Sequence, residues 1–377
     1  MFYSCTLKRL CGLLHETLCL LMDRSTFGRI RMRVAHYIKV QLLELDRRLL
    51  VPLFSAHPRL ASLYYFLVST KFGREHRAVL RGRRRYYESL KDPSNSSFLL
   101  RRNIHRLEKG LIMRPRRSVF AVDYIKETVD QYAICMASNA AHEAELQWAH
   151  DVLTDYFSSV ISDATVDRAR EAFDRCAETV FEYGSRVPYQ SEERQALSVD
   201  PEAFYDLCRR RRSVRWYDGR PVPRALLEQA VEAAIQAPSA CNRQPFRFSI
   251  FDNPEDAAKV GAITDGTAGF SQNFPCLVVV VGDLSAYPFE RDRHLIYVDA
   301  SLASMQFMLA LETLGLSSCP INWPDIELME RGMSEILGLA HHERPIMLIS
   351  VGYSDLTGGI PFSQKKMNHD MVRWESL

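Results

Sequence analysis

The sequence predicts an α+β domain preceded by an all-helical region, and three observations lead to this. Residues 1–185 repeat apolar residues at intervals of three and four with few turn signals, as helices do. After residue 204, helical periods alternate with short apolar or alternating runs that predict strands. Residues 186–204 separate the two patterns and predict a linker. The expected organisation is therefore a helical region over 1–185 and an α+β domain over 205–377.

Composition limits the class of protein. The chain has 377 residues, 47% hydrophobic and 25% charged, which is ordinary for roughly two globular domains. Its nine cysteines include no C-x-x-C pair, so neither a disulfide framework nor a zinc finger is indicated, and a reducing compartment is expected. Lys8, Arg9, His15 and Glu16 interrupt the apolar opening, so we expect neither secretion nor a membrane crossing. These points favour a cytoplasmic location.

Proline and turn residues divide the helical region. Stretches such as VQLLELDRRLLVPLF have helical spacing, and Pro52, Pro58, the turn at 92–97 and Pro115 separate the helices. Residues 71–87 carry seven Lys/Arg against one Glu. They form either a solvated helix face or a peripheral contact with an anionic membrane surface. No motif that reads nucleic acid is present, so nucleic-acid binding is not expected.

The elements of the α+β domain follow in order. Pro223 opens a helix whose apolar face holds Leu227, Val231, Ala234 and Ile235. Residues 246–250 alternate as a strand does, and CLVVVVGD is a short apolar run typical of a strand buried on both faces. Two helical segments then end at glycines that predict left-handed caps, and IMLISVGY predicts the last strand. The two capping glycines are Gly315 and Gly338.

Two segments of this domain carry chemistry. Arg211, Ser213 and Arg215 alternate along an extended segment, so their side chains project to one side. Two guanidiniums and a hydroxyl there suit a phosphate with a second anionic group, although a solvated basic linker has the same composition. In APSACNRQPFRF, Asn242 and Gln244 lie on a turn between a helix and a strand. The two amides either meet one edge of a ligand or serve the turn itself.

Taken together, these motifs resemble one family. R-R-S-V-R-x-[FY] at 211–217, P-S-x-x-N-x-Q-P-[FW]-x-F at 238–248 and L-G-L-x-x-x-P-I at 314–321 are similar to the flavin-dependent nitroreductase family. The resemblance covers about residues 205–377. It implies a central, mostly antiparallel sheet flanked by helices, a bound FMN, and NAD(P)H as co-substrate.

The resemblance also assigns roles to residues of this chain. Arg211 and Ser213 would contact the phosphate and ribityl end of FMN, and Arg215 would lie near N1 and O2, where reduction develops negative charge. The turn would reach the flavin from a neighbouring subunit, and a backbone N–H of Ile321 or Asn322 would lie near N5. Lys365 or Lys366 would meet the phosphate. The full set of expected cofactor-binding residues is Arg211, Arg212, Ser213, Arg215, Pro238, Ser239, Ala240, Asn242, Gln244, Pro320, Ile321, Asn322, Lys365 and Lys366.

The expected function is that of an FMN-dependent oxidoreductase of nitroreductase type. Hydride would pass in two steps from NAD(P)H through flavin N5 to a small electron-poor acceptor, in a homodimer that shares its two flavin sites. Two alternatives stay open: a flavin dehydrogenase or oxidase acting on an organic substrate, and a membrane-associated, non-catalytic flavin-fold protein. His341, His342 and Glu343 lack metal-ligand spacing, so no metal is expected.

One departure from the family pattern adds a further hypothesis. Between residues 283 and 299 the chain has only a short segment, where many relatives of the family insert helices that cover the flavin. Either the helical region supplies this cover or the site is open.

Overall fold

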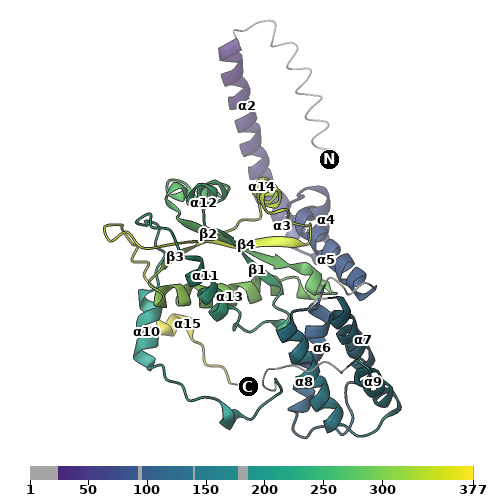
Figure 1. Ribbon diagram of the computed structural model, residues 1–377. Helices are drawn as coiled ribbons and strands as arrows, with labels where there is room; N and C mark the ends of the chain where they lie inside the picture. Colours follow the sequence, from purple (N-terminus) through teal and green to yellow (C-terminus); the bar gives the residue numbers. More distant parts are fainter. Residues whose placement is uncertain (1–23, 92–95, 139–140, 177–185, 377) are drawn as a thin grey trace. The chain divides into compact units, whose positions relative to one another are not determined.

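The computed structural model describes residues 24–91, 96–138, 141–176 and 186–376 (Figure 1). The chain divides into two compact units, residues 1–76 and 77–377. The apolar opening of the chain lies outside the described residues. Residues 186–200, in the predicted linker, form only a short 3-10 turn and are mostly exposed from residue 189 onward.

The first unit is a succession of helices. Its elements are α2 (Arg24–Leu45), the π-helical turn η1 (Asp46–Leu50), α3 (Val51–Ser55) and α4 (Pro58–Leu67). Pro58 occupies the first turn of α4, where its missing N–H costs nothing, and the His57 side chain caps that turn by accepting from Arg59 N–H. The Tyr64 hydroxyl donates to Asp46 Oδ1 at 2.6 Å, which ties α4 to the turn before α3.

Helices also form the beginning of the second unit. They are α5 (Gly73–Lys91), which begins in the first unit, α6 (Phe98–Leu111), α7 (Ile125–Ser138), α8 (Glu143–Ser159) and α9 (Ala164–Asp174). Helices α6 to α9 enclose a core of their own, in which Leu107, Tyr132, Leu153 and Tyr156 are fully buried. The predicted all-helical character of this part of the chain is confirmed.

A four-stranded antiparallel sheet forms the centre of the α+β part, with strand order β1-β2-β4-β3. The strands are β1 (Phe246–Phe251), β2 (Cys276–Asp283), β3 (Ser317–Asn322) and β4 (Glu343–Gly352). The helices around it are α10 (Pro201–Arg210), α11 (Arg224–Ala234), α12 (Pro254–Gly261), α13 (Leu295–Thr313), α14 (Glu327–Leu337) and α15 (Asn368–Met371). The predicted α+β class with a mostly antiparallel sheet is confirmed.

Helices cover both faces of this sheet, as Figure 1 shows. In β2, Val278 and Val280 belong to the core shared with α11 and α13, whereas Val279 and Val281 belong to the core shared with α12 and α14. This alternation explains why the strand is a continuous apolar run. The two glycine caps are as predicted, with φ of 77° at Gly315 and 61° at Gly338.

One predicted core position is wrong. Ile235 was expected on the buried face of its helix, but it is 45% exposed. Helix α11 ends at Ala234, and its buried positions are Leu227, Ala230 and Ala234. Beyond the helix end the helical period no longer applies, so Ile235 turns toward solvent.

One stretch among the described residues, Glu290–Thr313, is long and apolar enough by length and composition to cross a membrane. It contains α13, which packs against α11 and the sheet, and nearly half of its apolar stretch is buried. This burial is typical of the core helix of a globular domain.

Candidate functional site

The segment that carries Arg211, Ser213 and Arg215 is fixed against the edge strand β3. Ser213 forms a parallel bridge to Ser318, and Val214 N–H donates to Ser318 C=O at 3.1 Å. Tyr217 anchors the end of the segment, because its buried hydroxyl hydrogen-bonds Val214 C=O and the Ser350 hydroxyl, both at 2.8 Å. The sequence order R-S-V-R therefore runs alongside the beginning of β3.

The arginines of this segment have no carboxylate partner among the described residues, so they could bind an anion. Among the described residues, Arg211, Arg212 and Arg215 form no ion pair within 4.0 Å. Their neighbours in the sequence do, since Arg210 pairs with Glu312 and Arg220 pairs with Asp218. Arg211 Nε and the Ser318 hydroxyl are buried without a hydrogen-bond partner. Since buried donors are normally satisfied, these two atoms fit a ligand that supplies acceptor oxygens.

Arg215 is the last arginine of this segment and packs near Phe270. Its guanidinium carbon is 5.7 Å from the centre of the Phe270 ring, and Asn273 Nδ2 donates to its carbonyl oxygen at 2.8 Å. Burial raises the pKa of the neighbouring Cys319 thiol, and the charge of Arg215 and the hydroxyl of Ser213 partly oppose that rise. The Arg215 guanidinium and the Ser213 hydroxyl therefore lie near the Cys319 thiol.

The hydrogen bonds of β3 determine which of its backbone N–H and C=O groups point away from β4. In a strand, the N–H and C=O of one residue point to the same side, and successive residues alternate. Because Ser318 C=O faces Val214, residues 318, 320 and 322 face away from β4. Pro320 has no N–H, so it can face outward without leaving a donor unsatisfied. The N–H of Asn322 also faces outward, farther along β3 than the part that lies beside Ser213. Ile321 points its N–H toward β4, so of the two predicted donors only Asn322 is available to a ligand.

The second predicted segment is a strained turn before β1. It includes the 3-10 turn η4 (Ala240–Asn242), and φ is 54° at Cys241, 52° at Asn242 and 49° at Gln244. Non-glycine residues seldom adopt such values, and clusters of them are found at functional sites. Gln244 N–H donates to the Ser239 hydroxyl oxygen at 3.0 Å, which closes the turn on itself.

Hydrogen bonds from buried polar groups hold this turn in place. Asp299 Oδ2 accepts from Ala240 N–H at 3.0 Å and from the Tyr287 hydroxyl at 3.2 Å. Burial raises the pKa of the Asp299 carboxyl, while these two hydrogen bonds and the Arg243 charge oppose the rise. Arg243 is itself buried, and its guanidinium carbon lies 5.0 Å from the centre of the Tyr287 ring.

The helical region contacts both the turn and the short segment after β2. Arg101 of α6 donates to Asn242 C=O at 2.7 Å and to Gln244 Oε1 at 2.9 Å. Arg83 Nε of α5 donates to Pro288 C=O at 2.9 Å. A Cβ on Gly82 would lie 2.8 Å from the backbone of Leu284, so only glycine allows α5 to pack this closely against that segment. Helix α5 therefore packs on the short segment after β2, and α6 contacts the turn.

The two predicted segments do not meet within one chain. The turn precedes β1 at one edge of the sheet, whereas the arginine segment lies outside β3 at the other edge. They also lie at opposite ends of the strands, because Phe246 is level with Arg344 of β4 and Ser318 is level with Val351. Four strand spacings and seven residues along β4 then separate them by about 19 Å across the sheet and about 23 Å along it.

The two predicted lysines lie beyond β4. Lys365 and Lys366 are exposed in the C-terminal stretch, and within the described part of the chain neither forms an ion pair. Of the remaining predicted residues, Pro238 is exposed at the rim of the turn, and Ala240 supplies the N–H that Asp299 binds.

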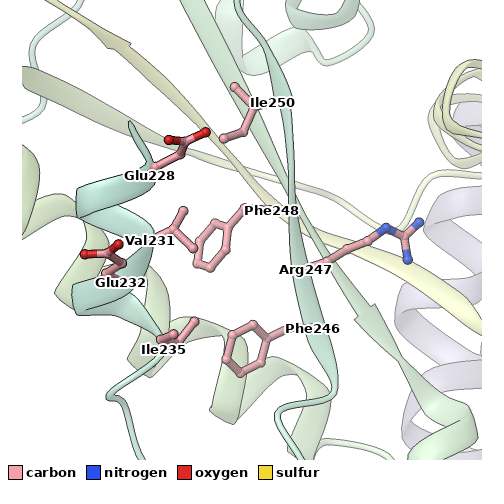
Figure 2. Close-up of a pocket in the computed structure, with 8 residues that line it drawn as sticks. All are labelled: Glu228, Val231, Glu232, Ile235, Phe246, Arg247, Phe248 and Ile250. Atoms are coloured by element: carbon pink, nitrogen blue, oxygen red, sulfur yellow. The ribbon is translucent and has the colours of Figure 1, made fainter. Parts of the chain in front are cut away.

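A separate groove of about 600 Å³ lies between α11 and β1. Figure 2 shows Phe246 and Phe248 directed toward Val231 and Ile235, while Arg247 points away from them. Glu228 and Glu232 form its acidic rim, and none of the predicted cofactor residues lines it. The groove is therefore not the cofactor site that the motifs indicate.

Sequence reasoning missed four residues that position the turn: Arg101, Arg243, Tyr287 and Asp299. Asp299 carried a signal, because an aspartate on a helix as apolar as 295–313 is costly to bury without a partner. Arg101 carried none, since its partners lie more than 140 residues away in the sequence.

The chain is similar to several known proteins. The sequence model of the nitroreductase family matches residues 208–266 and 261–353. A putative NADH dehydrogenase/NAD(P)H nitroreductase of Archaeoglobus fulgidus is 31% identical over 44% of this chain and 93% of its own length. Mouse iodotyrosine deiodinase 1 is 22% identical over 59% of this chain and 86% of its own length. Among solved structures, an FMN-dependent nitroreductase from Clostridium difficile R20291 is 24% identical over 45% of this chain and 98% of its own, with a TM-score of 0.39.

The family match and the nitroreductase relatives indicate an oxidoreductase domain, built here on an antiparallel sheet covered by helices on both faces. The chain belongs to the nitroreductase family.

Proposed function

We propose that this protein is an FMN-dependent oxidoreductase that takes hydride from NAD(P)H and passes it to an electron-poor acceptor. The observation that carries the proposal is the row of guanidiniums beside the outward edge of β3 that form no ion pair among the described residues, next to the buried, unsatisfied Arg211 Nε and Ser318 hydroxyl. Flavin bound there would supply the hydride chemistry at N5. The names of the nitroreductase relatives support the use of NAD(P)H.

The residues along β3 fit the successive parts of FMN. Arg211 and Ser213 would bind the phosphate and ribityl end, with the unpaired Ser318 hydroxyl beside them. Arg215 would place its charge at the pyrimidine edge, where it favours the negatively charged state. The outward N–H of Asn322 would donate a hydrogen bond at N5 and so orient the ring.

We further propose that two chains build each site. The strained turn with Asn242 and Gln244 lies at the opposite corner of the sheet from Arg215 in the same chain. A symmetric dimer would bring the turn of one protomer to the arginine segment of its partner, and both sites would form at once. Lys365 or Lys366, in the exposed C-terminal stretch, would then be free to reach a phosphate.

Purified protein provides the direct test. We expect it to retain FMN in a one-to-one ratio with the chain and to be reduced by NADH or NADPH under nitrogen. Reoxidation of the reduced protein by a nitroaromatic compound would complete the two half-reactions. Reduction by an organic substrate but by neither nicotinamide would favour a flavin dehydrogenase or oxidase. A protein without flavin that cannot be reconstituted with FMN would overturn the proposal.

A halogenated tyrosine belongs among the acceptors that are tested. Several relatives are named iodotyrosine deiodinases, and one of them matches 59% of this chain, more than the 44% of the Archaeoglobus protein. Release of halide from iodotyrosine by the reduced protein would identify this acceptor class.

Attachment to an anionic membrane surface is a second proposal, and it concerns α5. Ala78, Val79, Gly82 and Tyr86 are buried, so this face of the helix packs within the protein. On the opposite face, Arg77, Arg81 and Arg84 are exposed and follow one another by about one turn. Leu80, exposed on the same face, adds an apolar contact. Such a basic face suits peripheral binding near the cytoplasmic leaflet.

A further inference from the structure

The contact between Arg101 and the strained turn joins two parts of the second unit that are far apart in sequence. Arg101 Nε donates to Asn242 C=O at 2.7 Å, and its Nη2 donates to Gln244 Oε1 at 2.9 Å. The side chain is only 16% exposed. A guanidinium presents several N–H groups in a rigid plane, so it can hold two acceptors at a fixed separation, which an ammonium cannot.

The guanidinium is itself held by the helical bundle. Its Nη1 lies 3.2 Å from Glu145 Oε2 of α8, and its central carbon lies 5.6 Å from the centre of the Trp148 ring. Trp148 in turn donates to Glu108 Oε1 of α6 at 2.9 Å. Arg101 therefore cannot move without disturbing contacts between α6 and α8.

This arrangement decides which way the Gln244 amide faces. Gln244 Oε1 accepts from Arg101, and Nε2 donates to Ile235 C=O at 2.6 Å. An amide nitrogen has two N–H groups, so one donor of Gln244 stays available to a ligand. With Arg101 in place, Gln244 presents that N–H outward, because turning the amide would set its NH₂ group against the guanidinium.

We propose that Arg101 is a positioning residue for the flavin, acting through the turn at 240–244. It donates hydrogen bonds to Gln244 Oε1 and to Asn242 C=O, and so stabilises a backbone in which three residues have positive φ. The helical region would then shape the turn at 240–244, which each protomer would contribute to the flavin site of its partner. This inference rests on the proposed binding of FMN.

The test measures FMN affinity by quenching of flavin fluorescence in R101A, R101K and the unaltered protein. Loss of two charge-assisted hydrogen bonds should weaken FMN binding by about ten- to a hundredfold in R101A. R101K keeps the charge opposite Glu145 and provides a variant that retains the buried ion pair. Because lysine cannot bridge both acceptors, it should recover only part of the affinity and should shift the flavin absorption bands relative to the unaltered protein.

R106Q is the matched control. Arg106 lies on the same helix and is similarly half-buried, but its guanidinium lies over the Tyr124 ring at 3.6 Å, within the helical bundle. R106Q should lower thermal stability and leave FMN affinity and the absorption bands unchanged. Equal losses of FMN affinity in R106Q and R101A would show that only general destabilisation is being measured, and would overturn the inference.

A double-mutant cycle tests whether Arg101 acts through Gln244. If it does, R101A should cost much less affinity in a Q244A background than in the unaltered protein. Fully additive losses, or normal FMN binding with normal absorption bands by R101A and R101K, would overturn the inference while leaving the proposed function intact. Failure of the unaltered protein to bind FMN would instead overturn the proposed function.

Discussion

Val214 and Ser318 are joined by a single backbone hydrogen bond, 3.1 Å from nitrogen to oxygen, and this bond sets the orientation of the candidate site. It turns the carbonyl of Ser318 away from β4, and alternation then turns the N–H of Asn322 the same way. It also places Ser213, Arg215 and Asn322 along one edge. The first two of the following predictions depend on groups positioned in this way.

The backbone N–H of Asn322 can be removed without breaking the sheet. N322P should keep the fold, because the N–H faces outward from an edge strand, but should slow flavin reduction by NAD(P)H by about tenfold or more, since one hydrogen bond to the flavin is lost. N322A retains the N–H and is the control. Stopped-flow absorbance measures both, and equal rates in N322P and the unaltered protein would exclude this backbone role.

The charge of Arg215 should tune the flavin. R215Q removes a guanidinium that faces no carboxylate among the described residues, so folding stability should change little. The flavin reduction potential should become more negative, and the rate of reduction should fall by about a hundredfold, because the charge no longer stabilises the developing anion. Potentiometry against a reference dye checks the direction. A potential that stays the same or rises would contradict the assignment.

Glu330 should be important for stability. It is buried, lies 3.2 Å from Arg344 Nη2 and accepts from Trp323 Nε1 at 2.8 Å. E330A leaves the buried Arg344 without this carboxylate and should lower the free energy of unfolding by about 3–5 kcal/mol. R331A on the same helix breaks only an exposed pair with Glu327 and should cost about 1 kcal/mol or less. Urea denaturation monitored by circular dichroism compares the two variants.

Asp299 should give the protein a specific pH dependence. Burial raises the pKa of its carboxyl, so the folded state binds more protons than the unfolded chain between the two values. Its contribution to stability is therefore greatest below the ordinary aspartate pKa of about 3.9 and is lost as pH rises through the folded value. D299N does not titrate, so the unfolding free energy of the unaltered protein minus that of D299N should fall across this window. A difference independent of pH would show that Asp299 is not perturbed.

The exposed arginines of α5 should bind anionic vesicles. Replacing Arg77, Arg81 and Arg84 by glutamine should weaken co-sedimentation with phosphatidylserine vesicles by about a hundredfold, at about 1 kcal/mol for each charge near the surface. Vesicles of phosphatidylcholine alone are the control and should bind neither protein. Unchanged binding by the triple variant would assign any membrane contact to another part of the chain.

The sequence was sufficient for the elements of the α+β part because each has a strong local pattern. The apolar run of β2, the glycines after α13 and α14 and the motifs at 211–217 and 238–248 are all local signals. Ile235 was misplaced because the end of α11, rather than its period, determines that position. The location of both motifs at opposite corners of the sheet required strand order and register, which no local pattern encodes.

The contacts of the helical region could not be predicted for a similar reason. Arg101, Arg83 and Gly82 are ordinary helix residues by composition, and only their distant partners at 242, 288 and 284 distinguish them. Asp299 was within reach of prediction, since a carboxylate among apolar neighbours demands a partner, but the identity of that partner was not.

The tight packing of Gly82 against Leu284 has a practical consequence for the design of truncated forms of this protein. The polar stretch at 186–204 looks like a natural place to cut, yet a shortened chain starting at residue 205 would expose the surface that α5 covers and would release the turn from Arg101. The oxidoreductase part and its helical companion have to be expressed as one piece.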